Sequence, residues 1–281
     1  MTQSLSWREF HRNLTLRAKK RACLVIGAIV KGLSVEASLR VWNYLIRSVL
    51  EYGAEVTGFG QWPEAEYIQN EVGRKILGVI KSCSTLAVRG ELGWWTLKAR
   101  RDLVMLRFWG KIVNKRDNTL IKRIYRYRKR SQPIKGSWCD QVRNVLNDLG
   151  LGEYWESEDI GSVQAWSNRV EKEIKNREVL TWLNAVQAAP KLRTYRRIKS
   201  NLGLEEYLLD IPFQSRKLRS QMRSGSNFLR IEQGRWERLN REDRICLVCM
   251  TGEVEDEKHF LLDCYVYEED RQIMRKDKRK D

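Results

Sequence analysis

Four residues near the C-terminal end of the sequence have the types and spacing of a metal site. Cys246 and Cys249 form a CxxC pair, and His259 and Cys264 follow after nine and four intervening residues. Thiolates and imidazole are the ligands that zinc prefers, and four of them complete a tetrahedron with no open coordination position. The spacing therefore predicts a structural Zn²⁺ site, which holds the chain together and does not activate water.

The geometry between the last two ligands needs a departure from a regular helix. The acidic run 255–257 is typical of a helix N-terminus, where negative charge is favoured. On an ideal helix, His259 and Cys264 would point about 140° apart. We therefore expect Cys264 at a frayed or distorted helix end.

Other chemical uses of the sequence are less well supported. A redox CxxC normally opens a helix after a strand, and nothing of that kind surrounds Cys246. The glycines of 27–32 have P-loop spacing but lack the following lysine that contacts phosphate. His11 has no evident nucleophile beside it, and the remaining cysteines have no partner spacing. We therefore expect no catalytic centre in this chain, which would not be an enzyme on its own.

The charge of the sequence favours a polyanionic partner. It has 53 Lys and Arg against 36 Asp and Glu, a net charge of +17, and an isoelectric point near 9.7. Such a surplus binds phosphate backbones by releasing counterions, so RNA or DNA is the first partner to expect. An anionic membrane surface is the second partner to consider, and a solvated basic surface that only maintains solubility is the alternative to both.

Two stretches concentrate this charge. Residues 98–130 hold 13 basic and two acidic residues, and Tyr125 and Tyr127 alternate with cations, which suits phosphate contacts combined with base stacking. A second basic stretch covers 193–223. The predicted nucleic-acid contacts are Lys98, Arg101, Arg107, Lys111, Lys122, Arg123, Arg126, Arg128, Lys129, Arg130, Arg196, Arg197, Arg219 and Arg223.

The elements that carry these residues are predicted to be helices. Apolar residues recur with helical spacing in 36–52, 97–113, 138–149 and 166–183, and strand-like alternation is scarce. The turn residues of 131–137 and 210–212 indicate breaks between helical segments. We expect a mostly α protein with a small metal-bound element at its end.

The sequence also limits the cellular setting. The longest apolar run, 23–30, has eight residues, against the roughly 20 of a membrane-spanning helix, so we expect no membrane partner. An intracellular location follows, nuclear or cytoplasmic, where cysteines stay reduced and available to metal. The oligomeric state is left open.

The metal-site segment resembles the C-terminal cysteine–histidine segment of non-LTR (LINE-type) retrotransposon reverse transcriptase polyproteins. The similarity includes 229–235, 244–249 and 254–264, together with Tyr267 and Arg271. It continues upstream through 49–55, 90–93, 149–155 and 195–208, in the order that follows the family's polymerase palm.

This resemblance implies a fold and a division of the chain. A helical thumb-like region would cover 1–135, a helical linker 136–210, and an arginine-rich arm with the Cys3His zinc knuckle 211–281. The family's polymerase centre has adjacent aspartates that bind two metal ions, and this chain has no adjacent aspartates. The palm and the endonuclease are therefore expected to be absent.

The predicted function is accordingly nucleic-acid binding without catalysis. A separate reverse-transcriptase palm is a possible partner under this hypothesis. The alternative is a co-opted or decayed remnant that acts as a protein-interaction module, with weak nucleic-acid affinity that changes little with salt.

Overall fold

The computed structural model describes residues 7–131 and 134–277, with side chains described to residue 273. Helices make up 69% of the structure, which confirms the mostly α fold. Within those ranges the strand-like pairings are two isolated antiparallel bridges, Leu92 with Leu204 and Ile245 with Val254.

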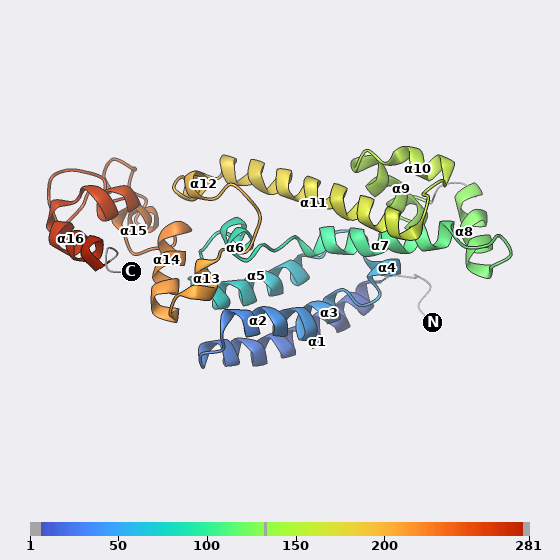
Figure 1. The fold of residues 1–281 in the computed structure, drawn as a ribbon, viewed down its shortest axis with the longest axis horizontal. Helices are drawn as coiled ribbons and strands as arrows, with labels where there is room; N and C mark the ends of the chain where they lie inside the picture. Colours follow the sequence, from blue (N-terminus) through green and yellow to red (C-terminus); the bar gives the residue numbers. More distant parts are fainter. Residues whose placement is uncertain (1–6, 132–133, 278–281) are drawn as a thin grey trace.

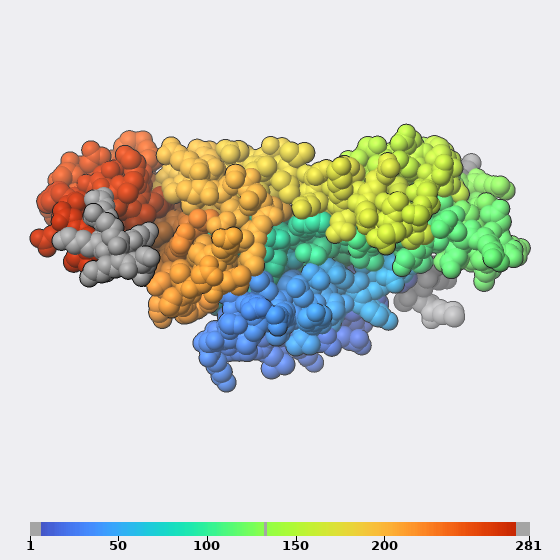
Figure 2. Space-filling view, viewed as in Figure 1, coloured from blue at the N-terminus to red at the C-terminus, as the bar shows by residue number. Residues whose placement is uncertain are grey.

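Two long antiparallel helices, α7 and α11, lie side by side along the molecule and carry the other elements (Figure 1). The N-terminal helices lie along one side of this pair, α8 lies at one end, and the predicted metal-binding segment (residues 246–264) lies at the other end (Figures 1 and 2). The first helices in chain order are α1 (Arg8–Val30), α2 (Val35–Val41), the π-helix η1 (Trp42–Arg47), α3 (Ser48–Leu50), α4 (Ala54–Thr57), α5 (Pro63–Leu77) and α6 (Thr85–Leu92). The central helices are α7 (Leu97–Val113), α8 (Leu120–Arg130), α9 (Trp138–Asp148), α10 (Gly152–Ser157) and α11 (Val163–Ala188).

The remaining elements are short and lead to the C-terminal end. They are the 3-10 helix η2 (Pro190–Leu192), α12 (Tyr195–Ile198), α13 (Tyr207–Asp210), α14 (Phe213–Arg223), α15 (Arg230–Trp236), the π-helix η3 (His259–Asp263), the 3-10 helix η4 (Tyr265–Tyr267) and α16 (Glu268–Asp277).

The four predicted helices are all present, and hydroxyl caps explain where several begin. The side chains of Thr96, Ser137 and Ser162 accept backbone N–H bonds at the starts of α7, α9 and α11. Such caps satisfy donors that a helix N-terminus leaves free. The 36–52 segment is α2, η1 and α3 in succession, so a π-helical turn interrupts a helix that was predicted to be continuous.

Two apolar cores share α11. Trp166, Val170 and Ile174 on its N-terminal half pack with α7–α10, whereas Trp182 and Val186 near its C-terminal end pack with the N-terminal helices. The predicted boundary at residue 135 lies between α8 and α9, which belong to the same core. Residues 136–210 therefore have no separate core of their own, because α11 packs along the whole body.

Most of the eleven tryptophans are used for packing. Trp42, Trp109, Trp166 and Trp182 are among the largest fully buried side chains, whereas Trp7 and Trp236 are exposed. The indole N–H groups of Trp166 and Trp182 donate to the carbonyls of Leu106 and Leu86, each at 2.9 Å. The Trp-rich helices consequently present little aromatic surface for a partner.

Close packing of α7 on α11 gives a first testable prediction. A Cβ at Gly110 would lie 2.2 Å from Cδ1 of Trp166, so Gly110→Ala forces a fully buried tryptophan to move. We expect a loss of about 1–3 kcal/mol in the free energy of unfolding. Gly27→Ala on α1 is the matched control, because a Cβ added at Gly27 would have no neighbouring heavy atom within 4 Å. That change should stabilise the protein by about 0.5–1 kcal/mol. Denaturant unfolding measures both, and a neutral or stabilising Gly110→Ala would contradict the packing.

Candidate metal centre and basic surfaces

Cys246, Cys249, His259 and Cys264 are brought together at the C-terminal end of the molecule. All four are buried, and their ligand atoms lie within 4.8 Å of one another. Sγ of Cys249 and Nε2 of His259 are 3.4 Å apart. Sulfur ligands at the corners of a zinc tetrahedron are about 3.8 Å apart, so this arrangement can hold a metal ion with only small side-chain shifts.

The first two cysteines lie on a tight knuckle. The bridge between Ile245 and Val254 closes its base, and the Cys246 N–H donates to the Glu253 carbonyl at 2.8 Å. At its tip the Met250 N–H donates to the Cys246 carbonyl, and Met250 has a φ of 52°. This left-handed residue folds the chain back so that both sulfurs face inward.

The last two ligands are aligned by a π-helical turn. The Cys264 N–H donates to the His259 carbonyl at 2.7 Å, a bond across five residues that defines η3. Asp256 begins this turn, because its carboxylate accepts the N–H groups of Lys258 and His259. The expected distortion is therefore present, and its form is a wider turn that directs both side chains to one side.

The surroundings of the cysteines favour metal binding. Hydrogen bonds from the hydroxyl and backbone of Thr251 lower the pKa of the Cys249 thiol to about 6. Burial raises the pKa of the Cys246 thiol. Because metal ligands must be thiolates, Cys249 is ready to bind near neutral pH, whereas Cys246 loses its proton most readily when a cation is present.

Two buried glutamates attach the metal-binding segment to the helices. The side chain of Glu257 accepts from Arg193 at 2.5 Å, Thr194 at 2.9 Å and Asn227 at 3.0 Å. Glu255 accepts the Arg230 N–H at 2.7 Å, at the start of α15. The segment predicted as an arm is thus fixed against the body, with a small core of its own around the cysteines.

Several cations predicted to bind nucleic acid are buried instead. Arg101 is 1% exposed, donates to the Gly60 carbonyl at 3.1 Å and stacks over Trp62. Lys122 is 3% exposed and donates to the Val113 carbonyl at 2.7 Å. These two predictions are wrong, because both side chains are enclosed by helix packing.

Other predicted cations neutralise carboxylates. Lys122 and Lys129 donate to Glu158. Burial alone would raise the pKa of the Glu158 carboxyl, but the hydrogen bonds from the two lysines outweigh it and lower that pKa. Lys98 pairs with the buried Asp102. Arg107 and Arg223 are also paired, Arg107 with Glu171 at 2.6 Å and Arg223 with Glu91. Since a cation paired with a buried or half-buried carboxylate must break that contact to bind phosphate, Lys98, Lys129 and Arg223 are corrected to structural roles. Arg107 pairs with an exposed carboxylate and remains at the surface.

The remaining predicted cations are at the surface, and Tyr125 is not. Its hydroxyl accepts from the Trp109 indole and donates to Glu158 inside the core, so it is unavailable for stacking on bases. Arg219 lies over the Tyr207 ring, and Arg196 donates to the Gln187 carbonyl. The surface cations of the predicted set are Arg107, Lys111, Arg123, Arg126, Arg128, Arg130, Arg196, Arg197 and Arg219.

Six residues of the α8 region line a shallow groove, which we call the arginine–tyrosine groove. They are Asp117, Arg123, Arg126, Tyr127, Arg130 and Ser131. Tyr127 is 70% exposed, and Arg126 pairs with Asp117 at 2.6 Å. Within the described part of the chain, we find no hydrogen-bond or ion-pair partner for the side chains of Arg123 and Arg130.

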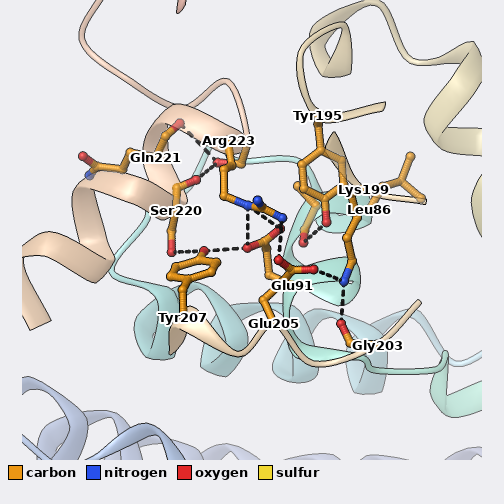
Figure 3. Close-up of polar contacts among 12 residues, drawn as sticks. Leu86, Glu91, Tyr195, Lys199, Gly203, Glu205, Tyr207, Ser220, Gln221 and Arg223 are labelled. Atoms are coloured by element: carbon orange, nitrogen blue, oxygen red, sulfur yellow. Dashed lines mark hydrogen bonds and ion pairs between the residues drawn. The ribbon is translucent and has the colours of Figure 1, made fainter. Parts of the chain in front are cut away.

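A buried polar network was missed by the sequence reasoning. Glu91 on α6, Tyr207 on α13, and Ser220 and Arg223 on α14 point toward one another (Figure 3). Glu91 is fully buried, accepts from Arg223 at 3.1 Å and from the Tyr207 hydroxyl at 2.5 Å. Burial and the neighbouring Glu91 raise the pKa of the Tyr207 hydroxyl, which stays protonated and donates. Glu91 lies outside the helices predicted from apolar periodicity, and a lone glutamate gave no signal of this role.

Comparison with known proteins adds no family assignment. No family model matches the sequence, and neither a similar curated protein nor a similar solved structure was found. In the described ranges, no helix combines the length and the apolar character needed to cross a membrane.

Proposed function

We propose that this protein is a nucleic-acid-binding module whose C-terminal segment folds around a structural Zn²⁺. The observation that carries the proposal is the arginine–tyrosine groove, where an exposed ring lies among three guanidinium groups. A single strand fits such a surface, because its bases stack on the tyrosine and its phosphates contact the arginines.

The charge distribution supports the proposal. In the folded protein, part of the positive charge is paired with carboxylates. Arg123 and Arg130 in the groove are exposed, and Arg128 is exposed on the same helix. Contacts from free guanidinium groups to phosphate require no existing salt bridge to break. The net charge of +17 adds long-range attraction to any polyanion.

Zinc is the proposed metal because of the donor set. Three cysteines and one histidine match the tetrahedral sulfur–nitrogen preference of Zn²⁺. Bound there, the ion would crosslink the knuckle to η3 and leave no position for substrate. The segment supplies structure, in keeping with a protein that binds and does not catalyse.

We also propose that the chain corresponds to the post-palm part of a non-LTR retrotransposon reverse transcriptase. The ordered sequence similarities support this origin, and a helical body followed by a metal knuckle agrees with it. In this setting the α8 end would hold the primer–template or its single-stranded extension while a separate palm performs nucleotidyl transfer.

A protein-interaction module is the second candidate. Exposed apolar side chains around the metal segment favour it, among them Trp236 at 71% and Met250 at 79% exposure. Under this alternative, nucleic acid would bind weakly and with little dependence on salt.

The salt dependence of binding separates the two. For the wild type and the Arg123→Gln/Arg130→Gln variant, fluorescence anisotropy with labelled single-stranded RNA, single-stranded DNA and duplex DNA would be recorded from 50 to 300 mM salt. If each of the two arginines neutralises one phosphate, the negative slope of log K against log salt should be shallower by about 1.4 in the variant than in the wild type for a single strand. Tyr127→Ala should weaken single-strand binding by about 1–3 kcal/mol without changing the slope.

Lys172→Gln/Lys175→Gln provides the matched control, because it removes two exposed charges from α11, away from the groove. Its slope should change less than that of the groove variant. Equal slopes in the two variants would place binding elsewhere. Weak wild-type binding that is insensitive to salt would reject the proposed function and favour the interaction module.

A further inference from the structure

A half-enclosed apolar cavity lies on the other side of α8 from the arginine–tyrosine groove. It measures about 380 Å³ and opens between α8 and α9, with α4, α7 and α10 contributing to its walls. Pockets of roughly 300–1,000 Å³ are the size that proteins use for small ligands. Its apolar lining includes Val56, Ile112, Ile121, Ile124, Ile134 and Trp138.

Several of these apolar side chains are more exposed than a packed core would leave them. Ile124 is 54% exposed, Ile134 56% and Val56 39%. Aliphatic groups gathered around one hollow bind apolar matter because its transfer from water is favourable. The aromatic rings of Phe108, Tyr125, Trp138 and Trp155 complete the apolar lining, so an alkyl or aryl body can pack against it.

The rim of the cavity is positively charged. Arg128, Lys129 and Arg143 line it, with Asp140 as the acidic residue. Lys129 is held by Glu158, and Arg143 lies 3.9 Å from Glu156. Arg128 is exposed, and among the described residues we find no ion-pair partner for it. It is thus the cation best placed to receive an anionic group.

Helical periodicity gives the two surfaces of α8 different lining residues, and Ser131, just after the helix, lines both. Ile121, Ile124 and Arg128 recur at spacings of three and four and line the cavity, whereas Arg123, Tyr127 and Arg130 line the groove. Substitutions at Arg128 or Ile124 therefore change the cavity alone, and substitutions at Arg123 or Arg130 change the groove alone, so the two sites can be tested separately.

We propose that this cavity binds a small amphipathic anion, an acyl or aryl carboxylate whose apolar body enters between α8 and α9 while its carboxylate pairs with Arg128. The walls come from five helices, and this enclosure suits a compact molecule. Nothing in the proposal depends on nucleic-acid binding.

Cys139 offers a built-in reporter. It lines the cavity and is half-buried, whereas Cys23 is exposed on α1. A bound ligand should slow alkylation of Cys139 by a maleimide and leave Cys23 unchanged. Mass spectrometry of the digested protein measures both rates in one sample.

The experiment compares three ten-carbon probes on the full-length protein, below their micelle concentrations: decanoate, 1-decanol and decyltrimethylammonium. Calorimetry should show one decanoate per chain, with protection of Cys139. The alcohol should bind more weakly, and the cation should not protect Cys139. Arg128→Gln should weaken decanoate binding on the order of tenfold and leave 1-decanol unchanged. Lys172→Gln, an equal loss of charge outside the cavity, should have no effect.

A filling variant tests the location. Ile124→Trp should reduce the binding of decanoate and of the alcohol together, and melting curves show whether the variant stays folded. Absence of decanoate binding to the wild type, equal affinity for all three head groups, or unchanged binding in both Arg128→Gln and Ile124→Trp would overturn the proposal. Loss of nucleic-acid binding in the groove variant with decanoate binding intact would show that the two sites are independent.

Discussion

Removing the metal should unfold the segment from about residue 244 to residue 264 while the long helices stay folded. This segment has a core made of Cys246, Cys249 and Cys264, with Tyr267 packed against it, and few other apolar residues. Structural zinc contributes about 10–16 kcal/mol in apparent terms to small segments of this kind. The two main cores contain none of the metal ligands.

Hydrogen exchange with mass spectrometry would measure the effect before and after chelation. We expect amide protection to disappear across the knuckle and η3, and to fall around Arg193 and Asn227, since both lose their contact with Glu257 when the segment unfolds. Protection in α7 and α11 should persist. Elemental analysis should find one zinc per chain in the wild type.

Cys249→Ser should reproduce the chelated state, and Cys23→Ser is its matched control. Both changes replace sulfur with oxygen, but Cys23 is exposed on α1 and belongs to no cluster. An intact exchange pattern in metal-free protein would show that the segment folds without the ion. A different metal bound in place of zinc would correct the ion and keep the site.

Glu91→Ala should be strongly destabilising, with an expected loss of about 3–5 kcal/mol in the free energy of unfolding. The carboxylate is fully buried and accepts from Arg223 and from the Tyr207 hydroxyl (Figure 3). Without it, a half-buried guanidinium and a buried hydroxyl lose a partner, although Arg223 keeps Glu205 at 2.8 Å. Because Glu91, Tyr207 and Arg223 lie on three helices, the loss should loosen α13 and α14 from α6.

A second variant separates the cost of leaving Arg223 without Glu91 from the net contribution of the Glu91–Arg223 ion pair to stability. Glu91→Leu/Arg223→Met replaces both charges by apolar groups, and it should be less destabilising than Glu91→Ala. Chemical denaturation gives both values. A double variant at least as unstable as Glu91→Ala would mean that shape and not charge compensation sets the stability here.

The sequence alone was sufficient for the metal ligands and the main helices. Cys246, Cys249, His259 and Cys264 could be chosen because ligand type and spacing are local properties, and their clustering confirms that choice. The helices over 97–113 and 138–149 were predicted for the same reason, since apolar periodicity acts within a few residues. Even the departure from helical geometry before Cys264 could be predicted locally, from the angle between His259 and Cys264 on an ideal helix.

Which cations are free was decided by the tertiary structure. Arg101 and Arg123 look alike in the sequence, yet one is enclosed against Trp62 and the other lines an open groove. Lys122 and Lys129 are paired with Glu158, a residue about thirty positions away whose role no local pattern reveals. Charge composition counts residues, whereas availability depends on carboxylates that other helices supply.

Types and spacing of residues thus determined which four side chains could hold a metal ion at one end, and the net charge of +17 predicts a polyanionic partner. Only the packing of the helices decided which of these residues are buried and which are exposed. It placed Tyr125 inside and Tyr127 outside on the same helix, closed the cavity between α8 and α9, and fixed the metal segment to the body through Glu257. The physical reason is that burial and ion pairing join residues far apart in the chain, so they depend on how the helices meet and not on any one segment.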